Sequence, residues 1–259
     1  MIFMKIAKDV VIVTFLIGIV IGGFGTYFAM PKYINQTQPS CTINVSEICK
    51  GLIMPLNHEQ KIEMNVPAVD TEGMGVIAKL TTRIRPGSGL VLVSINDVLA
   101  EPDTLHSARS AARVAGNYAK INISNYDIIY SINVNASVVG GPSAGLAMAV
   151  STVLALRNET INNSIMMTGT INTDGSVGPV GAVPEKAEAS KKAGATLFLV
   201  PLGHSSDIQY KEEKKCENYG SIEWCQIEYI PQRINIGQKY NITLVEVQNL
   251  SEAMKYFEQ

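Results

Sequence analysis

A serine and a lysine, each in a short distinctive motif, are the residues of this chain best suited to chemistry. Ser143 lies in the sequence Gly-Gly-Pro-Ser-Ala-Gly over 140–145, and Lys186 lies in Pro-Val-Gly-Ala-Val-Pro-Glu-Lys over 179–186. A serine hydroxyl becomes an effective nucleophile when a neighbouring base takes its proton. A lysine amine can be that base when burial lowers its pKa, because burial disfavours the charged form. The pair therefore indicates a peptide hydrolase with Ser143 as nucleophile and Lys186 as base.

The local sequence around each residue supports this chemistry. Ser143 is expected at the start of a helix, and Lys186 in the first turn of a helix that Pro184 opens. The partial positive charge of a helix start disfavours an ammonium group and can stabilise an oxyanion. Gly140 and Gly141 would let the backbone approach a substrate carbonyl, so N–H groups near them are the predicted oxyanion donors.

Each motif has a plainer explanation when it is taken alone. A serine before an apolar helix is most often only a cap. A lysine in a charged helical segment is normally solvated. Both motifs occur in one chain and in the expected order, and the segment 164–201 follows the first motif and contains the second. This coincidence favours the catalytic interpretation.

The segment 164–201, together with the upstream Gly-Gly-Pro-Ser-Ala-Gly, resembles the proteolytic domain of the Lon-type serine proteases. The resemblance is strongest over about 126–201. It implies a Ser–Lys dyad without a catalytic histidine, in which Ser143 is the nucleophile and Lys186 the base. Thr168 matches the family threonine whose hydroxyl helps to orient that lysine.

ATP-dependent Lon enzymes join this domain to an ATPase module, which needs a Gly-rich phosphate loop ending in Gly-Lys-Ser/Thr. No such sequence occurs in this chain. The chain is therefore similar to a stand-alone, membrane-anchored archaeal relative, which implies hydrolysis of unfolded or flexible proteins without ATP or another cofactor. Related domains form rings, so a hexamer is expected by analogy.

An uncharged apolar stretch over 10–30 predicts a transmembrane anchor, because a helix of that length crosses a hydrocarbon core of about 30 Å. Lys5 and Lys8 precede it, so the positive-inside rule leaves residues 1–9 in the cytoplasm and the rest outside the cell. A cleaved signal peptide is the alternative. Its apolar region would be shorter and would end in a small-residue cleavage site, so the uncleaved anchor is favoured.

The four cysteines, Cys41, Cys49, Cys216 and Cys225, all follow the predicted anchor. An even number on the outer side of a membrane indicates disulfides. Pairing within each local pair is the simplest hypothesis, and two other connectivities remain open. Their spacing is wider than that of zinc ligands, so no metal site is predicted. An excess of Asn-X-Ser/Thr sequences also favours a glycosylated exterior.

Hydrophobic periodicity predicts one mixed domain, α+β or α/β, over 66–259, after a polar linker with a cysteine loop over 31–65. Apolar runs at 74–85 and 90–96, joined by a Pro-Gly turn, predict a hairpin. The segment 204–233 is a charged insertion, expected to be a solvated surface and otherwise a lid or a partner contact. The other predicted helices are 104–118, 142–157, 185–193 and 250–257, and the other predicted strands are 127–134, 165–171, 176–180, 196–200 and 244–247.

The overall charge is close to balanced, with a formal net charge of −2, so nothing indicates binding to nucleic acid. The preferred function is an ATP-independent serine endopeptidase at the outer face of a membrane. One alternative is a non-catalytic, membrane-tethered binding module on the same fold. Another is a self-processing factor that cuts only its own linker.

Overall fold

A computed structural model of this chain describes residues 58–95, 102–135 and 141–258. These residues belong to a compact unit that runs from Ile53 to Gln259. Helices and strands alternate in it, so the predicted mixed α/β character is confirmed. In the part of the chain covered by these three ranges, no helix is both long enough and apolar enough to cross a membrane. The predicted anchor, Cys41, Cys49 and Gly140 lie outside the described residues.

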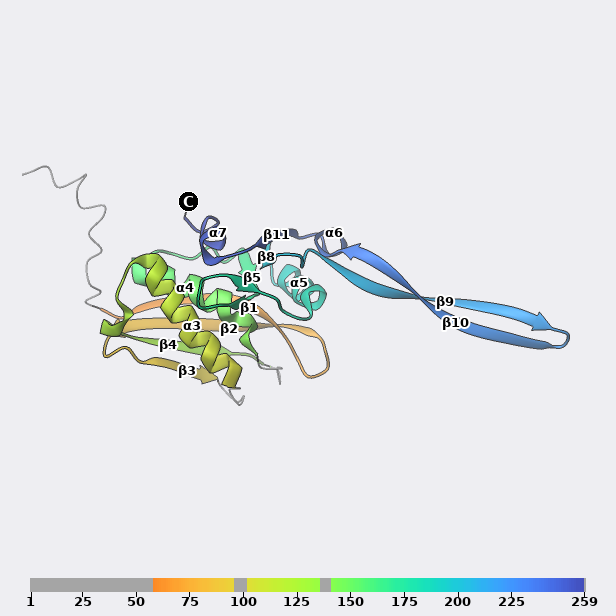
Figure 1. Cartoon of the computed structure of the whole chain (residues 1–259), viewed down its shortest axis with the longest axis horizontal. Coiled ribbons are helices and arrows are strands. Elements are labelled where there is room, and N and C mark those ends of the chain that lie inside the picture. The colour runs from red at the N-terminus through yellow and green to blue at the C-terminus, as the bar shows by residue number, and fades with distance from the viewer. Residues whose placement is uncertain (1–57, 96–101, 136–140, 259) are drawn as a thin grey trace, which may run out of the picture. The chain divides into compact units, whose positions relative to one another are not determined.

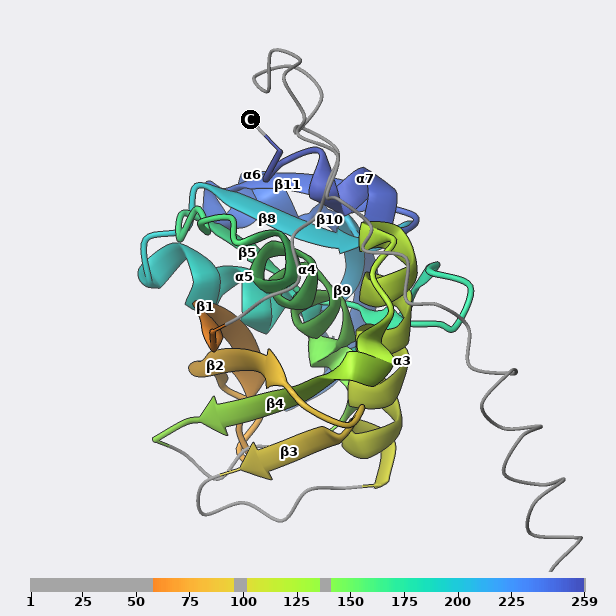
Figure 2. The same cartoon turned by 90° about the vertical axis from the view of Figure 1, so that its left-hand side faces the viewer.

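The first sheet has four strands in the order β1-β2-β4-β3. Strand β1 begins at Gln60 rather than at the predicted domain start of 66, because alternating apolar residues from Ile62 onward face the core. Figure 2 shows this sheet on one side of helix α4. The strand bounds are β1 Gln60–Val69, β2 Gly75–Pro86, β3 Val91–Ile95 and β4 Tyr126–Asn133.

The predicted hairpin between 74–85 and 90–96 is wrong. Strand β2 pairs with β1 instead, and β4 lies between β2 and β3. Asp127 at the start of β4 holds the connecting segment in this path, since its carboxylate accepts hydrogen bonds from the N–H groups of Ser88 at 2.9 Å and Leu90 at 3.1 Å. The carboxylate also fills the space that a side chain on Gly87 would need. The Pro-Gly segment therefore wraps around the end of β4 and does not close a tight turn.

Two helices pack against the core face of this sheet, α3 (Pro102–Ala119) and α4 (Gly145–Arg157). Helix α4 is buried along its whole length from Gly145 to Leu156, as its nearly continuous apolar sequence predicts. Figure 2 shows α4 between the first sheet and a second one. This central position makes its N-terminal end a rigid support for the residues that precede it.

The second sheet is parallel, with the order β11-β8-β5, and its strands β5 and β8 are buried on both faces. Met167 and Leu199 face the cluster around α4. Met166, Phe198 and Val200 face a smaller cluster beneath helix α5. Burial on both faces explains the nearly unbroken apolar sequences of β5 and β8. The bounds are β5 Ile165–Met167, β8 Leu197–Pro201, β11 Thr243–Val247 and α5 Val183–Lys192.

The predicted strand 165–171 is interrupted after Met167. Gly169 has a φ of 159°, a conformation that favours glycine, and the chain turns there out of the parallel sheet. The following strand β6 (Thr170–Ile171) pairs with β7 (Val177–Gly178) instead. The interruption leaves Thr168 at the end of β5, where the site described below is built.

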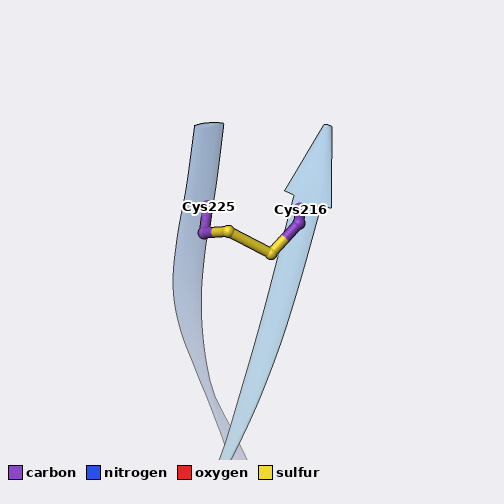
Figure 3. Close-up of a disulfide and its surroundings, with 2 residues drawn as sticks. All are labelled: Cys216 and Cys225. Carbon is purple, nitrogen blue, oxygen red and sulfur yellow. A yellow bond between two sulfur atoms is a disulfide. The ribbon is translucent and has the colours of Figure 1, made fainter. Parts of the chain in front are cut away.

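The charged insertion forms a long antiparallel hairpin of β9 (Ser206–Tyr219) and β10 (Ile222–Asn235), shown in Figure 1. Cys216 and Cys225 face each other across it and form a disulfide, shown in Figure 3, which confirms local pairing for these two cysteines. Two short helices complete the unit, α6 (Ile236–Tyr240) and α7 (Leu250–Met254).

Candidate active site

A pocket of about 420 Å³ contains both Ser143 and Lys186 in its lining. Residues from the end of β1, from the segment before α4, and from the segment before α5 meet there. The two residues singled out in the sequence are therefore brought together by the fold, although many residues separate them in the chain. The pocket is lined by Ala68, Val69, Gly141, Pro142, Ser143, Thr170, Pro179, Val180, Gly181, Ala182 and Lys186.

Ser143 lies in a 3-10 turn, Pro142–Ala144, that runs directly into α4. This differs slightly from the prediction, which placed the serine in the α-helix itself. Gly141 precedes the turn with a φ of 149°, which favours glycine. Pro142 occupies the first turn, where its missing N–H costs no helical hydrogen bond.

Hydrogen bonds from two other elements hold this turn in place. The Ser107 hydroxyl on α3 donates to the Pro142 carbonyl at 3.1 Å. The Gly169 N–H donates to the Ser143 carbonyl at 2.9 Å, and the Leu146 N–H donates to the Gly169 carbonyl at 3.0 Å. The backbone of the serine is thus fixed from both sides, which limits the positions its hydroxyl can reach.

The last glycine of the motif, Gly145, is required by close packing. A Cβ atom at this position would lie 2.6 Å from the Ser107 hydroxyl oxygen and 2.9 Å from the Ile171 backbone nitrogen. Real side chains do not approach that closely, so the motif glycine allows α4 to begin against α3 and β6. Ser107 was not singled out in the sequence, because nothing near it in the chain marks a supporting role.

Lys186 lies in the first turn of α5, as predicted, and only 5% of its surface is exposed. Burial lowers the pKa of its amine to about 8, and the nearby Glu185 carboxylate opposes this only partly. The residue before the helix, Ala182, adopts a left-handed conformation with a φ of 56°. The Ala182 carbonyl accepts a hydrogen bond from the Lys186 N–H at 3.1 Å, so this turn fixes the position of the Lys186 backbone from which the side chain extends.

Thr168 connects the lysine to the serine segment. The Lys186 amine lies 3.4 Å from the Thr168 hydroxyl and donates to it. The same hydroxyl donates to the Ser143 carbonyl at 3.3 Å, and the Thr168 N–H donates to the Leu199 carbonyl at 3.0 Å. Because the threonine hydroxyl uses its proton on the serine carbonyl, it can only accept from the lysine. This arrangement orients the amine at the edge of the pocket.

Several pocket residues were not predicted as part of a site. Ala68 and Val69 end strand β1, and Pro179 and Val180 lead into α5, so the walls are mostly apolar. No sequence signal distinguishes Ala68 and Val69 from ordinary core positions, whereas Pro179 and Val180 belong to the motif over 179–186 but were given no role there. None of the three histidines, all of which fall within the described ranges, lines this pocket.

Residues 56–229 match the family described as the Lon protease (S16) C-terminal proteolytic domain. Lon protease 1 of Bacillus subtilis (strain 168) is 28% identical over 173 residues, which cover 64% of this chain and 22% of that protein. Lon protease 1 of Sorangium cellulosum (strain So ce56) is 30% identical over 186 residues, covering 68% and 22%. Lon protease 1 of Myxococcus xanthus is 32% identical over 143 residues, covering 54% and 17%. The chain thus spans about a fifth of the length of these relatives.

Proposed function

This chain belongs to the Lon protease (S16) C-terminal proteolytic domain family, and from that premise we propose that it is a serine endopeptidase working through Ser143 and Lys186. The observation that carries the proposal is a buried amine with a lowered pKa in the same pocket as the motif serine. Burying an amine without a paired counter-charge opposes folding, so a chain rarely keeps such a group unless it serves a function. A strongly shifted pKa in a pocket is typical of functional groups.

In the proposed reaction, neutral Lys186 takes the proton of the Ser143 hydroxyl as the serine oxygen attacks a peptide carbonyl. The protonated lysine then gives this proton to the leaving amine, and the C–N bond breaks. Water then attacks the resulting ester while Lys186 takes a proton from it. The bond between the acyl carbon and the Ser143 oxygen breaks, and Lys186 returns the proton to that oxygen, which releases the acid and restores Ser143. Thr168 acts as a positioning residue, since its hydrogen bonds fix the amine relative to the serine backbone.

The oxyanion of the tetrahedral intermediate needs donors close to Ser143. Pro142 has no N–H, and the first N–H groups of a helical turn have no partner inside it. The Ser143 N–H at the start of the 3-10 turn is therefore the proposed donor among the described residues, with Gly141 allowing close approach of the substrate. Gly140 was predicted for the same role and lies outside the described residues.

The apolar pocket walls fit apolar side chains near the bond that is cut. We propose that the substrates are unfolded or flexible polypeptides. The uncharged stretch 10–30 supports an anchored enzyme whose catalytic unit faces outward, and the disulfide in β9–β10 supports an oxidising compartment. Assembly into a ring remains a proposal by analogy.

The test is casein hydrolysis by the full chain in detergent, comparing wild type with Ser143→Ala, Lys186→Ala and Lys186→Arg. Each variant should lose at least about 10³-fold in kcat/KM, because each removes the nucleophile or a base that can become neutral. Lys192→Ala is the matched control on the same helix; its exposed ion pair with Glu188 contributes little, so activity should be unchanged.

Circular dichroism should show that all four variants remain folded. A serine-directed phosphonate should label wild type and not Ser143→Ala, with the adduct identified by mass. Retained casein hydrolysis in folded Ser143→Ala or Lys186→Ala would remove the assignment of the dyad. Absence of both hydrolysis and labelling in wild type would favour the binding-module alternative.

A further inference from the structure

The β9–β10 hairpin presents an apolar face that no other part of the described chain covers. Directly opposed residues of an antiparallel pair share a face, as do residues two apart on one strand. The register therefore places four large apolar side chains on one face, each between 54% and 65% exposed, next to exposed Pro231 and the disulfide. We call it the tyrosine–isoleucine face, and it consists of Ile208, Tyr210, Ile227, Tyr229 and Pro231.

The charges on this face cancel. Glu212 and Glu223 are matched in number by Lys214 and Arg233. The opposite face of the hairpin is mainly polar along its middle, with exposed Lys211, Glu213, Lys215, Gln226, Glu228 and Gln232. Its one large exposed apolar side chain among the described residues is Trp224, towards the end of the hairpin. The hairpin is thus amphipathic along its middle, with an apolar, neutral side and a solvent-facing side. A surface that binds an ion or a charged lipid would carry an excess of one sign of charge, which this face lacks.

The hairpin edges are poorly suited to binding an added strand. The outer edge of β9 carries the charged run 211–215, and β10 contains Pro231, which has no N–H to donate. Charges and proline are the usual means by which edge strands avoid pairing with another chain. Recognition must therefore use the face and not the edges.

The area of the tyrosine–isoleucine face is small for a protein dimer. Five side chains at this exposure offer on the order of 100 Å² each, or about 500 Å² on each copy. A stable interface usually buries about 800 Å² on each partner. A partner that binds through this face therefore needs a second attachment to the chain that keeps it close.

The predicted anchor supplies such a tether, and here the inference rests on the proposed function. The segment 31–59 between the anchor and β1 cannot span more than about 100 Å even when fully extended. Strands of 14 residues make the hairpin about 46 Å long. A hairpin of this length is a large part of the greatest distance that the segment 31–59 allows between the anchor and β1, so its face can contact the bilayer. Tethering raises the local concentration enough for a weak contact to form.

We propose that the tyrosine–isoleucine face lies on the surface of the bilayer that holds the chain's own anchor. Tyrosine side chains favour the membrane–water interface, where the ring is buried and the hydroxyl stays hydrated. Isoleucine and proline add apolar area next to them. Because the face is neutral, binding needs no anionic lipid and should be insensitive to salt. The polar face, which includes the ion pair between Lys215 and Glu228, remains in water.

The chain provides a natural probe, because Trp224 is its only tryptophan and lies opposite Glu217 on the polar side of the hairpin. A matched protein carries Trp224→Phe with Tyr229→Trp, which moves the single tryptophan to the tyrosine–isoleucine face. Both full-length proteins are reconstituted in phosphatidylcholine vesicles, with and without brominated acyl chains that quench tryptophan on contact. Flotation measures anchoring, and casein hydrolysis checks that both proteins are intact.

The expected result is that both proteins float, and that brominated lipid quenches the tryptophan at position 229 at least twofold while Trp224 changes little. Quenching should persist in 0.5 M salt, roughly five times the ionic strength at which the Debye length is about 10 Å. Flotation without quenching at position 229 overturns the inference and leaves the anchor in place. Equal quenching at both positions also overturns it, because the contact would then not be specific to one face.

Failure of both proteins to float contradicts the anchoring part of the proposed function, and this inference with it. A blue-shifted tryptophan at position 229 in detergent, together with a dimer by sedimentation, would show that a second copy covers the face. That outcome also overturns membrane contact. Casein hydrolysis reports separately on the proposed chemistry, so the two failures are distinguishable.

Discussion

At the scale of single residues, the environment of Lys186 decides the chemistry. The amine is buried in a pocket with mostly apolar walls, and it donates a hydrogen bond to the hydroxyl of Thr168. A neutral lysine needs no counter-charge, and the nearby Glu185 carboxylate only partly offsets the cost of burying an ammonium group there. The same burial that destabilises the charged form makes the amine available as a base near neutral pH.

The pH dependence follows from this lowered pKa. Because the free amine is the active form in the proposed mechanism and its pKa is about 8, kcat/KM for a neutral peptide should rise about tenfold per pH unit below that value and level off above it. The measurement is a pH–rate profile with a peptide that carries no titratable group. A profile that stays flat between pH 6 and about 9 would contradict a role for Lys186 as base.

Stability should depend on pH in the same direction. The unfolded chain holds the lysine proton up to about pH 10.5, whereas the folded chain releases it near pH 8, so unfolding takes up a proton between these values. The free energy of unfolding should therefore rise with pH across that window, by up to about 3 kcal/mol relative to Lys186→Met. Urea denaturation of both proteins at pH 7 and pH 10 measures the difference.

At the scale of elements, one turn and one hairpin show how local features serve the site. The chain leaves the parallel sheet at Gly169, and this places Thr168 between the lysine helix and the serine segment. The hairpin β9–β10 is a separate addition whose residues do not line the catalytic pocket. An isolated two-stranded hairpin is marginally stable in water, so the disulfide is expected to hold it together.

Removing that disulfide should loosen the hairpin and leave catalysis intact. In Cys216→Ser with Cys225→Ser, the loss of a cross-link over a sequence separation of 9 should cost the hairpin about 2.5 kcal/mol. Hydrogen exchange in β9 and β10 should become faster, while hydrolysis of a short peptide stays within about twofold of wild type. A large loss of peptide hydrolysis would show that the hairpin supports the pocket.

At the scale of the whole molecule, the unit that begins at Ile53 contains both hydrophobic clusters and the complete described pocket. The fragment 53–259 should therefore fold without the preceding residues and cleave an unstructured peptide with the kcat/KM of the full chain. ATP with Mg²⁺ should not change that rate. Peptide and casein assays of the fragment, with and without nucleotide, check both statements; a nucleotide-dependent rate would contradict ATP independence.

The features that could be predicted from sequence are those encoded by neighbouring residues. The apolar run of α4 indicated a buried helix, Pro184 indicated the start of α5 close to Lys186, and the spacing of Cys216 and Cys225 suggested their pairing. Each of these rests on local periodicity, turn chemistry or motif, which do not depend on distant parts of the chain. The resemblance to Lon-type proteases also came from contiguous motifs.

What depended on the tertiary structure is the set of contacts between distant segments. Strand β4 lies between β2 and β3, and Asp127 holds the Pro-Gly segment around its end; no local pattern signals that contact. Likewise, Ala68 and Val69 line the pocket and Ser107 supports the serine turn only because β1 and α3 pack there. Local motifs are enough to indicate candidate reacting groups, because the side-chain types and their neighbours are encoded in short segments. Long-range packing decides whether those groups meet in a buried, apolar pocket.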